Sequence, residues 1–159
     1  MLPARKAFYL PKGVEFAEAG VTTYAVATDR HVFKERAKTK PNQTVLVLGA
    51  GWGGGIHTVQ MAKVFGNRVM GADVSDEKLQ KIKQNGADEV IELKGKDMAQ
   101  EVRKVTNGKG VDTEVDMVCT QETIKGCTKS LARDGRLVLV GVPRNITSLD
   151  FNTTPTNSV

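Results

Sequence analysis

A cluster of glycines at residues 49–55 is the part of the chain whose composition and spacing most directly suggest chemistry. The segment reads GAGWGGG and contains the pattern G-x-G-x-x-G at Gly49, Gly51 and Gly54. Glycines at this spacing let the backbone approach a pyrophosphate, which the first amide groups of a following helix then bind. Trp52 stands inside the run, where a bulky indole would obstruct that approach. The segment is therefore either a dinucleotide loop with an unusual substituent or a glycine-rich turn that only resembles one.

An acidic residue follows the glycines at the distance expected for ribose recognition. Asp73 ends a second apolar run, about 20 residues beyond the glycines. A carboxylate there would accept hydrogen bonds from the adenosine ribose and repel a 2′-phosphate, so the sequence favours NAD over NADP. The alternative, that Asp73 only caps a turn, is less favoured because strand, loop, helix, strand and acid occur in order. Lys78 either reaches the same ribose or is an ordinary surface lysine.

The cysteines and histidines lack partners that the sequence identifies. Cys119 ends a predicted strand, and because no histidine or cation is nearby in the sequence we interpret it as an inert, partly buried thiol. Cys127 is expected to pack inside a helix, and His57 either donates to a phosphate or lies exposed in the first turn of a helix. No partner for His31 can be identified from the sequence. No spacing is typical of a catalytic constellation or a metal site, so no catalytic residue and no metal ligand are predicted.

Alternating strands and helices must position these residues, and the hydrophobic pattern from residue 44 onward predicts that alternation. Apolar runs predict strands at 44–49, 67–74, 88–93, 111–119 and 136–142, and helical periodicity predicts helices at 56–66, 75–85, 96–106 and 121–132. Successive βαβ units predict an α/β fold. We expect a Rossmann-type, doubly wound parallel sheet of about five to six strands, with helices on both faces.

The chain is expected to contain three regions. Residues 1–43 form an N-terminal helical lead-in, with helical character over 14–38 and a polar interruption around 28–30. Residues 44–143 form the NAD-binding Rossmann domain, and residues 144–159 form an irregular tail.

Composition limits the class of protein. The chain has 159 residues, 40% of them hydrophobic and 26% charged, as is typical of one globular domain. No apolar run approaches the roughly 20 residues of a membrane helix, and early prolines interrupt any signal-peptide core, so we expect a cytoplasmic protein. The net charge of +5 comes from interleaved basic and acidic residues. This favours a solvated mixed surface over a nucleic-acid site.

Seven segments together resemble the zinc-type, medium-chain alcohol dehydrogenases and their quinone-reductase relatives. They are AGVTTYAV (19–26), TVLVLGAG (44–51), TVQMAK (58–63), GADVSDEKL (71–79), NGADEVIEL (85–93), NGKGVD (107–112) and GRLVLVGVP (135–143). Their order and spacing match the cofactor-binding half of such enzymes over nearly the whole chain. The resemblance implies a Rossmann domain that binds NAD at the carboxyl edge of its sheet.

The resemblance also assigns roles to matching positions. It implies that the glycine turn holds the pyrophosphate, and that the acid and lysine after the second strand hold the adenosine ribose. The ends of the fourth and fifth strands would lie beside the nicotinamide, and a threonine of AGVTTYAV would lie near the cofactor. The candidate cofactor-binding residues are Thr22, Gly49, Gly51, Trp52, Gly53, Gly54, Gly55, Asp73, Lys78, Cys119, Thr120, Gly141 and Val142.

Some positions depart from the family pattern. The family usually has glycine where this chain has Trp52, and valine or leucine where it has Gly54. Members that use zinc tend to have cysteine where this chain has Glu18, and one glutamate is not a zinc site. The zinc-binding motifs of the catalytic half, and the strand that usually follows GVP, have no counterpart in the sequence.

We therefore expect the NAD-binding domain of an alcohol-dehydrogenase-like oxidoreductase, in which hydride passes between an alcohol or carbonyl substrate and nicotinamide. The catalytic domain is missing, so the chain alone should bind NAD with little turnover, and zinc would belong only to the missing part. Two alternatives stay open: a zinc-independent quinone or enoyl reductase domain that uses NADPH, and a non-catalytic Rossmann module that senses nucleotide or binds a partner.

The expected partners are NAD and either a catalytic domain or a second copy of the chain at the open edge of the fifth strand. No nucleic acid and no membrane are expected as partners.

Overall fold

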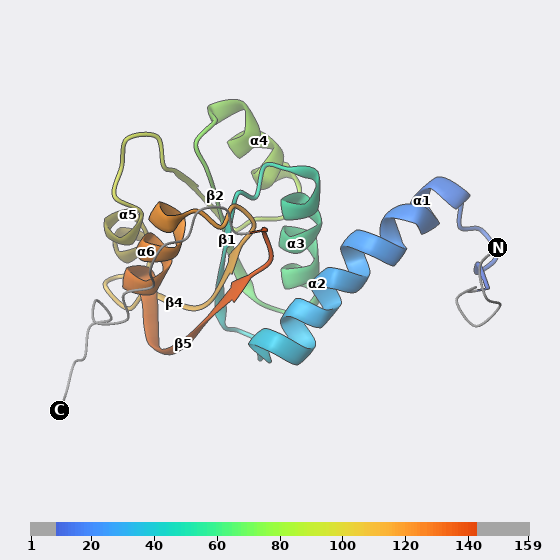
Figure 1. Cartoon of the computed structure of the whole chain (residues 1–159), viewed down its shortest axis with the longest axis horizontal. Helices are drawn as coiled ribbons and strands as arrows, with labels where there is room; N and C mark the ends of the chain where they lie inside the picture. Colours follow the sequence, from blue (N-terminus) through green and yellow to red (C-terminus); the bar gives the residue numbers. More distant parts are fainter. Residues whose placement is uncertain (1–8, 143–159) are drawn as a thin grey trace.

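A parallel sheet with helices on both sides forms the body of the protein, and one long helix projects from it (Figure 1). The computed structural model describes residues 9–142. The strands are β1 (Thr44–Leu48), β2 (Arg68–Asp73), β3 (Glu89–Glu92), β4 (Val111–Asp116) and β5 (Leu131–Leu139). The helices between them are α3 (Gly53–Val64), α4 (Asp76–Gln84), α5 (Met98–Val105) and α6 (Gln121–Ser130). All paired strands are parallel, in the order β3-β2-β1-β4-β5, which confirms the predicted Rossmann-type sheet.

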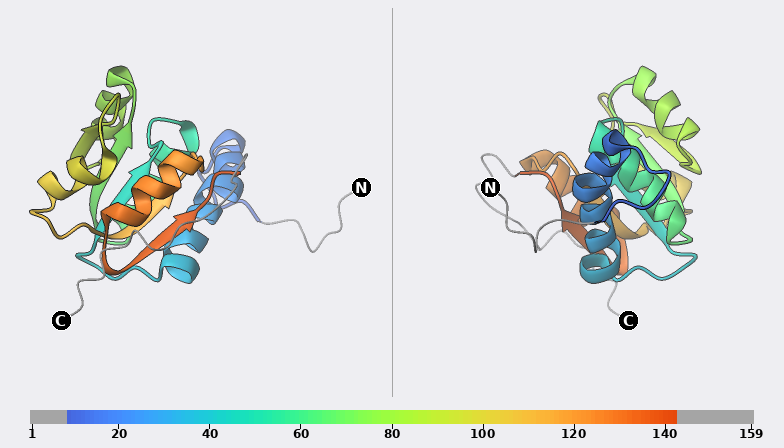
Figure 2. Two further views of the ribbon diagram at one scale, coloured as in Figure 1. Left: turned by 60° about the vertical axis from the view of Figure 1, so that its left-hand side comes forward. Right: turned by 90° about the vertical axis from the view of Figure 1, so that its right-hand side faces the viewer.

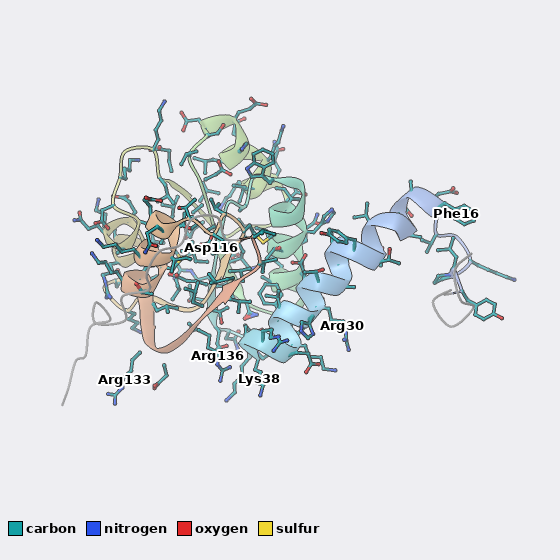
Figure 3. All side chains as sticks on the ribbon, in the orientation of Figure 1. Phe16, Arg30, Lys38, Asp116, Arg133 and Arg136 are labelled. Atoms are coloured by element: carbon teal, nitrogen blue, oxygen red, sulfur yellow. The ribbon has the colours of Figure 1, made fainter. Side chains whose placement is uncertain are left out.

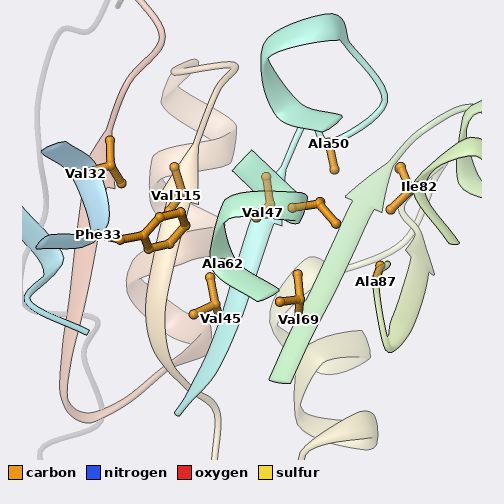
Figure 4. Close-up of a cluster of buried hydrophobic side chains, with 11 residues drawn as sticks. Val32, Phe33, Val45, Val47, Ala50, Ala62, Val69, Ile82, Ala87 and Val115 are labelled. Atoms are coloured by element: carbon orange, nitrogen blue, oxygen red, sulfur yellow. The ribbon is translucent and has the colours of Figure 1, made fainter. Parts of the chain in front are cut away.

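Alternate residues of β1 belong to separate hydrophobic cores. Val45 and Val47 pack in a cluster with residues of α3, α4 and the N-terminal helix (Figure 4). Leu46 and Leu48 pack in a second cluster with residues of α5 and α6. A strand whose consecutive apolar residues are all buried must be covered on both faces. The two clusters therefore confirm the predicted double winding, which the turned views also show (Figure 2).

The N-terminal segment forms one continuous helical run. It consists of α1 (Phe16–Val21), η2 (Thr22–Val26), α2 (Ala27–His31) and η3 (Val32–Ala37), of which the two η segments are π-helical. The expected polar interruption around residues 28–30 is wrong. Asp29 is only 2% exposed, because its carboxylate accepts a hydrogen bond from the Thr58 hydroxyl of α3 at 2.6 Å. The polar side chain thus joins two helices.

Two boundaries beside the glycine turn differ from the predictions. Helix α3 begins at Gly53 rather than at residue 56, because Trp52 already has the extended backbone of an N-terminal cap. Strand β4 ends at Asp116 rather than at residue 119. Cys119 has a positive φ of 55°, and its amide donates to the Asp116 carboxylate at 2.9 Å, which turns the chain out of the sheet.

The last strand also begins earlier than expected. Helix α6 ends at Ser130 and β5 follows at once from Leu131, whereas the sequence predicted a helix to 132 and a strand from 136. A register shift between the pairings of Val111 and Thr113 absorbs the additional residues of β5. Within residues 9–142, β5 and β3 are the outer strands of the sheet. The predicted tail at 144–159 lies outside the described residues.

Candidate functional site

The candidate site lies at the carboxyl ends of the central strands, where the strand order reverses. Strand β1 lies between β2 and β4, so the chain leaves it first to one side and later to the other. Ligands of open α/β sheets bind in the crevice at such a point. A cavity of about 720 Å³ opens there, lined by Gly49, Asp73 and Val118 at strand ends, by Lys78 of α4, and by residues of α5 and α6.

Close packing explains two glycines of the turn. A Cβ on Gly51 would lie 2.7 Å from the Asp73 carboxylate, and one on Gly55 would lie 2.5 Å from the carbonyl oxygen of Gly49. Both distances are too short for a real Cβ contact. Gly49 has a φ of +72°, the left-handed conformation that glycine adopts without strain. The turn therefore depends on glycine at these three positions.

The remaining two glycines are less constrained. A Cβ on Gly53 would meet nothing within 4 Å, and one on Gly54 would meet only the Met117 methyl, at 3.1 Å. The G-x-G-x-x-G pattern selected Gly54 as its third glycine, but Gly55 is the residue that lets α3 approach the end of β1. The pattern found the turn and misplaced its last member by one residue.

Helix α3 directs its N-terminus at the turn. Its first internal hydrogen bond runs from the Ile56 amide to the Trp52 carbonyl, at 2.9 Å. The amides of Gly53, Gly54 and Gly55 therefore precede the hydrogen bonds of the helix itself. Amides at this position, together with the helix dipole, favour an anion. The turn and helix fit a pyrophosphate.

Asp73 is held at the base of the cavity by the turn. Its side chain accepts hydrogen bonds from the Gly51 amide at 3.1 Å and from the Val74 amide at 2.8 Å, through different carboxylate oxygens. The Lys78 ammonium lies 3.8 Å from the same carboxylate. Each carboxylate oxygen can accept more than one hydrogen bond, so capacity remains for two ribose hydroxyls. The donor and acceptor chemistry fits the adenosine ribose.

Trp52 lies at the rim of the cavity and is 68% exposed. The Lys78 ammonium is 4.3 Å from the centroid of the indole, within the range of a cation–π interaction. The ammonium therefore contacts the indole on one side and approaches Asp73 on the other. The sequence indicated that the indole could obstruct a pyrophosphate at the turn. It did not indicate that the indole pairs with Lys78, because the two residues come from different helices.

Cys119 is a buried thiol at the end of β4. It is 1% exposed, and burial, with the Asp116 carboxylate nearby, raises the pKa of the Cys119 thiol to about 11. A thiol with such a pKa carries almost no thiolate at neutral pH, in agreement with the inert side chain that the sequence indicated. Asp116, the last residue of β4, is buried in the middle of the molecule (Figure 3). It accepts hydrogen bonds from Cys119 and from the Thr123 hydroxyl, and so fixes the turn.

The other four candidate residues lie outside the group formed by the glycine turn, Asp73, Lys78 and Trp52. Thr120 caps α6, where its hydroxyl accepts from the Thr123 amide at 3.2 Å. Gly141 lies against the backbone after β4, and Val142, beyond β5, is 80% exposed. Thr22 is exposed on the projecting helix and donates to the Glu18 carbonyl at 2.9 Å. None of these four residues lines the cavity beside the glycine turn.

A second cavity, of about 590 Å³, lies between the N-terminal helix, the first turn of α3 and the ends of β4 and β5. Asp29 and His57 line it, and sequence analysis missed the first of these. Burial raises the pKa of the Asp29 carboxyl, while Thr58 and His57 act in the opposite direction. One pattern in the sequence could have identified Asp29 as buried. Asp29 lies three residues before Val32 and four before Phe33, so helical spacing places it on the same face as these two apolar residues.

The described residues do not fit a zinc ion. Within residues 9–142, no three histidine, cysteine, aspartate or glutamate side chains are placed to hold a metal. Glu18, at the position where zinc-using members tend to have cysteine, is exposed. In the same range, no helix combines the length and apolar character needed to cross a membrane.

Comparison with known proteins gives a consistent result. The chain matches the zinc-binding dehydrogenase family over residues 53–158. It is 38% identical to an NAD-dependent alcohol dehydrogenase of Saccharolobus solfataricus, over 78% of this chain and 34% of that protein. It therefore spans about a third of the length of this curated relative.

Solved structures with the same fold include proteins whose names refer to quinone or to NADPH. A quinone oxidoreductase of Pseudomonas syringae has a TM-score of 0.85 at 27% identity, over 96% of this chain and 47% of that one. A mycobacterial protein in complex with NADPH has a TM-score of 0.81 at 29% identity, over 91% of this chain and 44% of that one.

Proposed function

The chain belongs to the zinc-binding dehydrogenase family, and on that premise we propose that it is the NAD-binding Rossmann domain of an alcohol-dehydrogenase-like oxidoreductase. The observation that carries the proposal is a carboxylate, Asp73, that is 5% exposed at the end of β2 and hydrogen-bonded to the glycine turn. When bound, the nicotinamide would supply hydride transfer to or from an alcohol or carbonyl substrate. The activity of the whole protein is part of the proposal.

The residues of this chain would bind and orient rather than react. The amides at the start of α3 would receive the pyrophosphate, because they precede the hydrogen bonds of the helix. Asp73 would accept hydrogen bonds from the ribose hydroxyls while it keeps the Gly51 amide, so that ribose and turn are fixed relative to each other. The cavity of about 720 Å³ would hold the adenosine.

NAD is proposed over NADPH because the charge of Asp73 would face a 2′-phosphate. One observation favours the second candidate, a quinone or enoyl reductase domain that uses NADPH. The Lys78 ammonium lies 3.8 Å from Asp73, so a cation is present where a 2′-phosphate would need one. The NADPH complex of the mycobacterial relative supports the same alternative.

We expect the unmodified protein to bind NADH at least about tenfold more tightly than NADPH, a difference of about 1.4 kcal/mol. Asp73→Ala should remove most of this preference, because it removes the repulsion and the ribose acceptor together. The measurement is the Kd of each cofactor by fluorescence titration. Glu92→Gln is the matched control, since it removes a carboxylate from the end of the neighbouring strand β3. Equal affinities in the unmodified protein would contradict the proposal.

Replacing Trp52 by glycine is expected to change the Kd for NADH by less than about tenfold, because an exposed cation–π contact is worth about 0.5–1 kcal/mol. Trp52→Phe, which keeps an aromatic face for Lys78, should change it less. Both are measured by calorimetric titration. If Trp52→Gly instead binds NADH about a hundredfold more tightly, the indole occupies the pyrophosphate position.

Beyond NAD, the proposed partners are a catalytic domain or a second copy of the chain at the outer edge of β5. An outer strand offers unpaired backbone groups to another strand. Sedimentation as a monomer at high concentration would argue against the second copy. A cytoplasmic location stays a prediction from composition.

A further inference from the structure

Asp29 is a buried acid that the proposed nucleotide loop does not use. One carboxylate oxygen accepts from the Thr58 hydroxyl at 2.6 Å, and the other has no hydrogen-bond partner among the described residues. The residue is 2% exposed. A buried polar atom without a partner costs free energy that a ligand with a matching donor would recover. The open oxygen therefore indicates a missing hydrogen-bond donor.

The second cavity provides the space in which such a donor would lie. Asp29 lines it together with Tyr24 of the N-terminal helix, Gly54 and His57 of α3, and Met117 after β4. Gly54 contributes no side chain to the wall, so the cavity extends between the first turn of α3 and the N-terminal helix. The volume of about 590 Å³ is sufficient for a flat heteroaromatic ring and its substituent.

The position of this cavity relates it to the other half of a dinucleotide. A dinucleotide crosses the crevice at the switch point, with one nucleoside on each side of its pyrophosphate. The adenosine half is proposed to lie at Asp73, at the end of β2. The second cavity borders the same N-terminus of α3 and residues that follow β4 and β5. The remaining nucleoside would therefore be directed toward Asp29.

We propose that Asp29 accepts a hydrogen bond from the carboxamide NH₂ of the nicotinamide and thereby positions the ring in the second cavity. This rests on the proposed function, since it requires that the domain bind NAD. The carboxamide carries two N–H donors, and the open oxygen of Asp29 is an acceptor when the carboxyl is ionised. Asp29 is a positioning residue in this arrangement, and Thr58 holds its other oxygen.

The test compares three ligands by calorimetric titration of the whole chain: NADH, ADP-ribose, and reduced acetylpyridine adenine dinucleotide. ADP-ribose lacks the nicotinamide, and the acetylpyridine analogue has a methyl ketone in place of the carboxamide. Asp29→Asn keeps an acceptor for Thr58 but turns the open oxygen into a donor. It should weaken NADH about tenfold, leave ADP-ribose within about twofold, and remove any preference for NADH over the analogue.

The control separates positioning from support of the helix. Thr58→Val removes the hydrogen bond that holds the other oxygen of Asp29, so it should weaken NADH more than ADP-ribose, though less than Asp29→Asn does. Glu114→Gln is the control: it neutralises another buried acid with one unpaired oxygen, but Glu114 lines neither cavity, so the ratio of NADH to ADP-ribose affinities should stay unchanged. Equal weakening of both ligands by Asp29→Asn would overturn the inference, as would equal affinity of the unmodified protein for NADH and the analogue. If neither NADH nor ADP-ribose binds the unmodified protein, the proposed function itself fails.

Discussion

Gly55→Ala is expected to lower the free energy of unfolding by about 1–3 kcal/mol or more and to abolish detectable NADH binding. The added Cβ would lie 2.5 Å from the carbonyl oxygen of Gly49 and 2.7 Å from Ala50 Cα. Both neighbours are backbone atoms, so neither can rotate away, and α3 would have to move off the end of β1. That movement would displace the first-turn amides from the glycine turn.

Gly53→Ala is the matched control, two residues earlier in the same helix. Its Cβ would meet nothing within 4 Å, so we expect the free energy of unfolding to stay within about 0.5 kcal/mol or to rise slightly. Urea unfolding followed by circular dichroism measures both variants, and NADH titration is added for Gly55→Ala. If the two variants are equally stable, the close approach of α3 to β1 does not limit the fold.

The free energy of unfolding is also expected to fall by a few kcal/mol as the pH rises from 5 to 8.5. Glu114 of β4 is 1% exposed, and burial raises the pKa of its carboxyl from the ordinary 4.5 to about 8. Ser130 is hydrogen-bonded to one of its oxygens, and the other has no partner among the described residues. The folded protein therefore holds a proton that the unfolded chain releases between these pH values.

The contribution of protonated Glu114 to the free energy of unfolding is complete below pH 4.5 and is lost as the pH rises through about 8. Glu114→Gln keeps the shape of the neutral acid and should remove most of the slope, so that the variant becomes the more stable protein at pH 8.5. Urea unfolding at pH 5, 7 and 8.5 measures the effect. The series stops there because burial also raises the pKa of both cysteine thiols.

Asp29→Asn should be measured in parallel, because burial raises the pKa of Asp29 as well, and a raised carboxyl pKa lowers the free energy of unfolding in the same direction as the pH rises. A slope in Glu114→Gln as steep as in the unmodified protein would mean that Glu114 is ionised in its buried position.

The sheet could be predicted because its central strands carry an unambiguous pattern. Four consecutive apolar residues at 45–48 require burial on both faces, and helix-length segments between such runs require parallel crossovers. The start of α3 could not be predicted in the same way. Glycine is a poor helix former, yet Gly53–Gly55 form the first turn of α3, and only Gly55 of the three packs closely against the end of β1.

Buried polar residues are the main feature of the fold and of the second cavity that could not be predicted from the sequence. Asp29 belonged to the predicted polar interruption, and Glu114 to the strand predicted at 111–119. Neither was identified as buried, because polar side chains are ordinarily exposed. Their burial depends on Thr58 and Ser130, which are distant in the sequence and become neighbours only after folding. Asp73 could be identified from the sequence because it lies at a characteristic spacing after the glycines, at the end of the second strand.

The single tryptophan gives the domain a built-in optical reporter. Indole emission overlaps the absorption of reduced nicotinamide, so a reduced dinucleotide held beside Trp52 would act as an acceptor for resonance energy transfer. Because the ring lies at the cavity rim and not in the core, its emission also responds to solvent and to the Lys78 ammonium. The residue that departs from the family pattern is thus the one through which occupancy of the cavity becomes visible without a label.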